Sequence, residues 1–255
     1  MRLQSSCTLL LATCLGLTGC EVQSKSRGIS EPADRTQEPG FVSLFDGKTL
    51  TGWHAIPTQT TSDWSVRDGT ITGHGSANRL AYLVWRDLQL TDFELRLSYR
   101  MLTDGNSGVE VRAQPDTSGK RPFEGYHADL GHVGIGPHIL GAWDFHFARR
   151  KEHPCNRGTR LVIRENGSAR YSKLDPDTAL ALSDVRKRDW NHLRVVVRGN
   201  HFQSFINGKL AAEFTDNARP GRLDHGAIGL QLHDKGMQVA FKDIRLRRLR
   251  EPPPR

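Results

Sequence analysis

The sequence predicts an all-β domain built as a sandwich of two antiparallel sheets. Residues 93–101 alternate apolar and polar side chains without a break, which is the period-2 pattern of a strand with one buried face. Asn207-Gly208 lies between further strand-like runs, and this dipeptide tolerates the positive φ angles of a tight type I′ turn. Helical periodicity is weak and confined to residues 177–185, so a fold of alternating strands and helices is poorly supported.

The other predicted strands are separated by Gly, Asn and Asp residues. The Asn207-Gly208 hairpin follows strands over 193–197 and 202–206, and its return strand ends at Phe214. Further strands are expected over 41–45, 64–72, 80–85, 108–113, 126–130, 161–164, 227–233 and 239–249. Residues 40–250 are enough for one large sandwich, and we interpret them as a single domain.

The first 39 residues have the composition of an export signal and a tether. Met1-Arg2 supply positive charge and an apolar run follows to Thr18, so residues 1–19 are expected to be a cleaved signal peptide. Leu17-Thr18-Gly19-Cys20 resembles the bacterial lipobox, which implies that Cys20 carries a lipid; an ordinary signal peptide is the alternative. Residues 20–39 are polar and predict a flexible tether, and residues 251–255 a disordered tail.

This interpretation places the protein in a bacterial cell envelope, facing the periplasm or the cell surface, with its lipid in a membrane. Cys155 would then be the one cysteine left in the folded domain, so no internal disulfide is expected, and we assign this thiol no role. The chain has 36 Lys plus Arg against 28 Asp plus Glu, but the excess is spread out except at 245–250. A nucleic-acid partner is therefore not expected, whereas loose attraction to an anionic membrane is compatible with the charge.

Three predicted strands have one apolar face and one face that carries charged, imidazole or amide side chains. Side chains alternate along a strand, so the residues between the apolar positions share the opposite face. Two interpretations explain polar residues on one face of these strands. Either the face is simply exposed to solvent, or the polar residues of the three strands line one functional groove. The polar residues are Glu110 and Arg112, His127 and Asp129, and Gln231 and His233.

Many short fragments along the domain match one family in order. They include Phe45-Asp46-Gly47-Lys48, Gly52-Trp53, Trp64-Ser65-Val66, Asp68-Gly69, Asp92-Phe93-Glu94-Leu95, Asn106-Ser107-Gly108-Val109, Gly125-Tyr126, Trp190-Asn191, Asn207-Gly208-Lys209 and Gly229-Leu230-Gln231-Leu232-His233. In this order they resemble the 3-keto-disaccharide hydrolase family over residues 40–249. The resemblance implies a concanavalin-like or laminin-G-like jelly roll and cleavage of 3-keto-glycosides by 1,2-elimination, by hydration of the resulting glucal, or by both.

The chemistry of such a substrate requires few groups. A ketone at C3 acidifies the C2 proton, so Asp129 or His127 would be the base, Arg112 the partner of the ketone or oxyanion, and His233 an acid or a second ligand-binding group. The expected substrate-binding residues are Asn106, Ser107, Glu110, Tyr126, Trp143 and Gln231. Trp143 could stack on a sugar ring or fill the core.

Five of the eleven histidines fall within 127–153, a stretch rich in Gly and His between 131 and 158. Imidazole suits Zn, Mn or Co, so a divalent metal is one hypothesis, with Ca as a further candidate, and a polar loop is the other. The histidines are His127, His132, His138, His146 and His153.

Other enzyme classes lack their motifs, since there is no Gly-x-Ser-x-Gly and no paired carboxylate strand of a retaining glycosidase. The rival from another class is a non-catalytic, lectin-like carbohydrate-binding module. A surface protein that the lipid holds for assembly is a third possibility.

Overall fold

The structure, a computed structural model, describes residues 38–77, 80–86, 89–131, 139–148 and 150–249. The predicted signal peptide, Cys20, the tether up to residue 37 and the predicted tail 251–255 lie outside the described residues.

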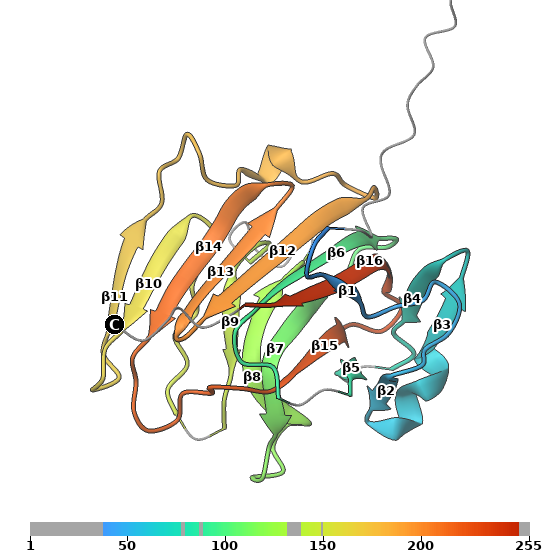
Figure 1. Cartoon of the computed structure of the whole chain (residues 1–255), viewed down its shortest axis with the longest axis horizontal. Coiled ribbons are helices and arrows are strands. Elements are labelled where there is room, and N and C mark those ends of the chain that lie inside the picture. The colour runs from blue at the N-terminus through green and yellow to red at the C-terminus, as the bar shows by residue number, and fades with distance from the viewer. Residues whose placement is uncertain (1–37, 78–79, 87–88, 132–138, 149, 250–255) are drawn as a thin grey trace, which may run out of the picture. The chain divides into compact units, whose positions relative to one another are not determined.

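The described residues form two sheets (Figure 1). The ten-stranded sheet has the order β11-β10-β14-β13-β12-β6-β16-β4-β3, and β1 also pairs with β16. Its strands are β1 (Val42–Ser43), β3 (Trp64–Arg67), β4 (Thr70–His74), β6 (Phe93–Met101), β10 (Thr159–Ile163), β11 (Ala169–Lys173), β12 (Asn191–Arg198), β13 (His201–Ile206), β14 (Lys209–Asp216) and β16 (Gln238–Arg248).

The six-stranded sheet has the order β2-β5-β15-β7-β8-β9. Its strands are β2 (Trp53–Ile56), β5 (Ala81–Trp85), β7 (Gly108–Pro115), β8 (Phe123–Asp129), β9 (Trp143–His146) and β15 (Ala227–Leu232). Each neighbouring pair in this sheet is antiparallel.

The predicted all-β sandwich is confirmed, and strand β6 coincides with the alternating segment 93–101. The predicted hairpin is also present, because Asn207 and Gly208 have φ angles of 51° and 86° between β13 and β14. Two details differ. The segment 64–72 is a hairpin of two strands, β3 and β4, turning at Asp68 and Gly69 with positive φ at both, and β10 pairs with β14 in parallel.

The sequence analysis did not predict three of the strands, namely β2, β9 and β11. The weak helical pattern over 177–185 contains only the short 3-10 helix η3 (Leu182–Asp184). A second 3-10 helix, η2 (Thr58–Asp63), joins β2 to β3. No helix in the described part of the chain is long and apolar enough to cross a bilayer.

The hydrophobic core lies between the two sheets. Tyr126 of β8 packs against Phe202 of β13 and Phe214 of β14, with ring centroids 4.5 and 5.2 Å apart. Because alternate residues of a strand point to opposite faces, Tyr126 and Ala128 face the core, whereas His127 and Asp129 point away from it. Cys155 is also buried here, where burial raises the pKa of its thiol to about 11.

Candidate functional site

The six-stranded sheet carries a row of polar residues on the face turned away from the core, called here the polar face. In the antiparallel register Glu110 of β7 pairs with His127 of β8, and His127 pairs with Asp144 of β9. The same register sets Asp129 opposite Gly108, and His146 opposite Gly125. Directly paired residues point to the same side, so these side chains share one face.

The two histidines converge on one carboxylate oxygen. His127 Nδ1 lies 2.8 Å and His146 Nδ1 lies 3.1 Å from Oε2 of Glu110, and the two imidazole rings stack with centroids 4.8 Å apart. On its other side, His127 Nε2 is 3.6 Å from Oδ1 of Asp129. All four residues are buried.

Two glycines leave the room that this cluster needs. A Cβ on Gly108 would lie 2.1 Å from His127 Nε2, and a Cβ on Gly125 would lie 2.5 Å from Glu110 Oε1. The histidine therefore leans over strand β7, and the glutamate leans over strand β8. Any larger residue at these two positions would push the cluster apart.

The charges of the cluster are strongly coupled. Burial raises the pKa of Glu110, but His146 and hydrogen bonds from both imidazoles outweigh it and hold that pKa at about 2. Burial lowers the pKa of His146, yet Glu110 and Asp144 raise it to about 10. Burial dominates at Asp129 and raises its pKa to about 7. One carboxyl group on this face is thus poised to exchange a proton near neutral pH.

Four buried polar atoms on or beside the polar face have no hydrogen-bond partner among the described residues. They are Oε1 of Glu110, Nε2 of His127, Oε1 of Gln231 and Oδ1 of Asn106. The three oxygens are acceptors, and the Nε2 atom is the ring nitrogen of His127 that does not face Glu110. Buried polar atoms that lack a partner are costly, so a ligand or a water molecule bound at this face would satisfy them.

Glu110, His127 and His146 also form a possible metal-binding group, because their candidate ligand atoms lie within 4.8 Å of one another. The sequence had grouped five histidines, and the structure brings His127 and His146 together. His153 instead lines a different pocket with Arg150 and Lys151, and His132 and His138 lie outside the described residues.

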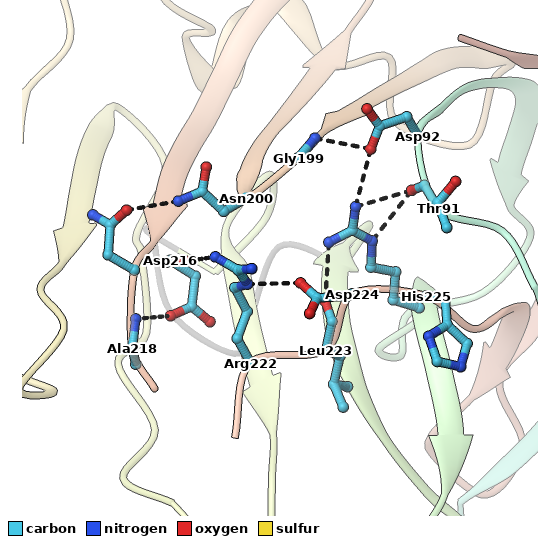
Figure 2. Close-up of polar contacts among 12 residues, drawn as sticks. Thr91, Asp92, Gly199, Asn200, Asp216, Ala218, Arg222, Leu223, Asp224 and His225 are labelled. Carbon is cyan, nitrogen blue, oxygen red and sulfur yellow. Dashed lines mark hydrogen bonds and ion pairs between the residues drawn. The ribbon is translucent and has the colours of Figure 1, made fainter. Parts of the chain in front are cut away.

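The expectation that Arg112 shares the polar face is wrong. A β-bulge shifts the register after Val111, and Arg112 has a φ of 50°. Its guanidinium donates to the carbonyls of Thr91 and Leu223, two residues that Figure 2 labels. It also lies over the ring of Phe202. The guanidinium is buried, and its hydrogen bonds connect the segments that contain Thr91 and Leu223 to strand β7.

Three expected substrate-binding residues face the interior instead. Tyr126 donates its hydroxyl to Asp216 in the core, and Trp143 is fully buried with Nε1 donating to the carbonyl of Ala212. Ser107 is fully buried and donates to the carbonyl of Gln231, which ties β7 to β15. None of them reaches the polar face.

Gln231 and His233 lie along the polar side of β15 and just beyond its end. Gln231 is paired with Tyr82 of β5, and its Nε2 donates to the Tyr82 hydroxyl. His233 is exposed, and its Nδ1 lies 2.8 Å from Asp234 Oδ1. Asp234 also accepts from the backbone N–H of Asn106, so these residues form one end of the polar face.

The sequence analysis did not place Asp144 or Tyr82 in this site, and it named His146 only as one of five candidate metal ligands. The signal for Asp144 and His146 was available, because Trp143-Asp144-Phe145-His146 alternates between core and polar face as β7 and β8 do. Tyr82 sits in an almost wholly apolar strand, and no pattern along that strand marks its hydroxyl.

Comparisons with known proteins find a matching family model and a curated relative. Residues 40–247 match the family model described as a 3-keto-alpha-glucoside-1,2-lyase-like domain. A 3-keto-disaccharide hydrolase from Bacteroides thetaiotaomicron is 24% identical over 241 residues, covering 82% of this chain and 78% of that protein.

Two solved structures of provisionally assigned glycosyl hydrolases from Parabacteroides distasonis share the fold. One has a TM-score of 0.55 at 19% identity, covering 83% of this chain and 94% of its own. The other has a TM-score of 0.53 at 21% identity, covering 82% and 99%. A galectin-like protein of unknown function from Bacillus subtilis has a TM-score of 0.50 at 11% identity, covering 78% and 90%.

Proposed function

The chain belongs to the family of 3-keto-alpha-glucoside-1,2-lyase-like domains, and we propose that it is an enzyme that cleaves 3-keto-glycosides on its polar face. The observation that carries this proposal is the buried acid–base cluster of Glu110, His127, His146 and Asp129, in which His127 Nε2 lies 3.6 Å from Asp129 Oδ1. The name of the Bacteroides relative supports the same substrate class.

Asp129 is the proposed base. The C3 ketone makes the C2 proton acidic, and a carboxylate with a pKa near 7 is well matched to removing it at neutral pH. The C2–H and C1–O bonds then break, a C1–C2 double bond forms, and the aglycone leaves as an alcohol with one proton. Addition of water across that double bond gives the free 3-keto sugar, so elimination followed by hydration amounts to hydrolysis.

We also propose that Glu110, His127 and His146 hold a divalent cation. Their candidate ligand atoms lie within 4.8 Å of one another, and Oε1 of Glu110 and Nε2 of His127 have no hydrogen-bond partner among the described residues. Two imidazoles with one carboxylate favour Mn, Co or Zn over Ca, which prefers oxygen ligands. Such an ion would supply positive charge to the oxygens of the enolate.

Turnover of 3-keto-trehalose and 3-keto-glucosides tests the proposal. Asp129→Asn keeps the shape of the side chain but removes the base, so kcat/KM should fall at least about a hundredfold. Asp68→Asn makes the same chemical change in the exposed β3–β4 turn and should match the unaltered protein. Equal activity of the two variants would exclude Asp129 as the base.

Binding and metal content separate the remaining alternatives. Saturable binding of sugars without turnover, across oxidised and ordinary glycosides, would favour the lectin-like module. Elemental analysis should find about one Mn, Co or Zn per chain, and Glu110→Gln should reduce that content severalfold. An active, metal-free enzyme would refute the cation site and leave His127 as a candidate base.

The cell-envelope location is a separate part of the proposal. The lipobox-like sequence supports a mature chain that begins with a lipidated Cys20 and is anchored in a membrane. Mass spectrometry of the mature N-terminus, together with Cys20→Ser, tests this directly. An unmodified N-terminus elsewhere in the chain would leave secretion without an anchor.

A further inference from the structure

A second, apolar pocket lies on the outer side of the six-stranded sheet, where it is lined from strands β2, β5, β7, β8 and β15. Its volume is about 190 Å³. Val84, Ala113, Phe123 and Ala227 are its buried members, and the other lining residues are half-buried or exposed, namely His54, Ile56, Gln114, Pro115 and Pro122. A cavity of roughly 150 Å³ is already large enough to hold a benzene ring.

This pocket adjoins the acid–base cluster across Gly229. Gly229 pairs with Glu110 on one side and with Val84 on the other. A Cβ on Gly229 would lie 3.6 Å from each of three atoms, the Cβ of Glu110, the ring of Phe123 and a methyl of Val84. The apolar pocket and the base of the Glu110 side chain are therefore separated by one glycine.

Aromatic and hydrogen-bond contacts also connect the pocket to the polar face. The rings of Phe123 and Tyr82 pack edge to face with centroids 4.3 Å apart. The Tyr82 hydroxyl accepts from Gln231, whose other amide atom is one of the unpartnered acceptors of the polar face. A ligand that spans from Glu110 on β7 to Val84 on β5 would cross β15 and pass from polar groups to hydrocarbon within two strand spacings, about 10 Å.

The chemistry of the lining decides what can enter. No Asp, Glu, Lys or Arg is among the described residues that line the pocket. Its polar side chains are the exposed His54 and the amide of Gln114, whose Nε2 already donates to the carbonyl of His225. The hydroxyls of a second sugar would find few partners here and would lose their water, whereas an apolar ring loses nothing on entry.

We infer that this pocket receives the leaving group, and that the substrates include glycosides with an apolar, ring-sized aglycone. The inference rests on the proposed 3-keto-glycoside cleavage and narrows its substrate class. In this arrangement the 3-keto sugar lies over Asp129 and Gln231, and the aglycone lies over Val84 and Phe123.

The test compares benzyl and methyl 3-keto-glucosides, each as both anomers. Their leaving alcohols have similar acidity, so a difference in kcat/KM reports recognition of the ring. Because a single methylene in an apolar pocket is worth roughly 10- to 200-fold, the benzyl substrate should be preferred by at least about tenfold.

Variants locate the preference in the pocket. Ile56→Asn places an amide at the half-buried rim, and Val84→Thr adds a hydroxyl to the floor without changing its volume; both should lower the benzyl-to-methyl ratio severalfold. Val42→Asn makes a comparable change at a residue of β1 that is 58% exposed in the other sheet, and it should keep the full ratio.

The outcomes distinguish this inference from the function on which it rests. Turnover of methyl 3-keto-glucoside with no preference for the benzyl substrate would overturn the aglycone pocket and leave the proposed function standing. A preference that both pocket variants retain would also overturn it. No turnover of either substrate would refute the proposed function and the inference together.

Discussion

Replacing Gly125 with alanine should displace the Glu110 carboxylate from both histidines. The new Cβ would lie 2.5 Å from Oε1 of Glu110, 2.9 Å from its Cγ and 3.1 Å from its Cδ, and ordinary contact begins at 3.4 Å. The carboxylate must therefore retreat by about 0.9 Å, a displacement of the size that costs enzymes about a hundredfold in rate.

A shift of that size along either hydrogen bond breaks it. The bonds from His127 and His146 measure 2.8 and 3.1 Å, and such bonds are weak beyond about 3.2 Å. We expect Gly125→Ala to lower kcat/KM about a hundredfold, to lower the unfolding free energy by about 1–3 kcal/mol, and to reduce the bound metal. Turnover assays, urea unfolding and elemental analysis measure these three effects.

Gly229→Ala is the matched control for stability and metal content. Gly229 lies in the neighbouring strand, but its Cβ would meet all its neighbours at 3.6 Å, which is ordinary van der Waals contact. Its unfolding free energy should stay within about 0.5 kcal/mol of the unaltered protein. A Gly125→Ala protein with full turnover and full metal content would refute the reasoning about Glu110.

Three further predictions concern buried groups. Arg112→Met should lower the unfolding free energy by about 3 kcal/mol in urea titrations, because the carbonyls of Thr91 and Leu223 lose their donor. The folded variant should keep its turnover, and a large loss of turnover without loss of stability would restore Arg112 to the site. The raised pKa of Asp129 means that protonation of this carboxyl group stabilises the folded state, so the unfolding free energy should fall as pH rises from about 4 through 7. In urea titrations of the metal-free protein, Asp129→Asn should flatten this fall. An unchanged pH profile in the variant would contradict the prediction. Cys155 is buried with a pKa near 11, so a thiol reagent at pH 8 should label it only after unfolding, and immediate labelling of the native protein would show that the thiol is accessible.

Much of the fold could be predicted because alternation along a strand is a local property. Segment 93–101 and the Asn207-Gly208 turn carry their structure in their own residues, and both were predicted correctly. Strand β11 could not be predicted in this way, because its residues are mostly exposed and it lies at the edge of the sheet. Its pairing with β10 supplies the order that its own sequence does not show.

The site was predicted in part for the same reason. Glu110, His127 and Asp129 lie on regular stretches of β7 and β8, where alternation holds. Arg112 lies in the bulge, and this one inserted residue reverses the face of the residues after it. The contact between His127 and His146 joins two strands that are separated by 13 residues of the chain, so the sequence could group the two histidines but could not show that they meet.

The positions of β15 and β16 have a consequence for how the domain forms. These last two strands are not at an edge, because β15 lies between β5 and β7, and β16 lies between β6 and β4. Until residues 227–248 have emerged, each sheet is divided, and four strand edges are left open. Folding must therefore wait for the end of the domain, and its long-range pairings make it slow. A chain cut before Ala227 would expose those edges to other chains, so a short C-terminal truncation should produce aggregation rather than a smaller folded protein.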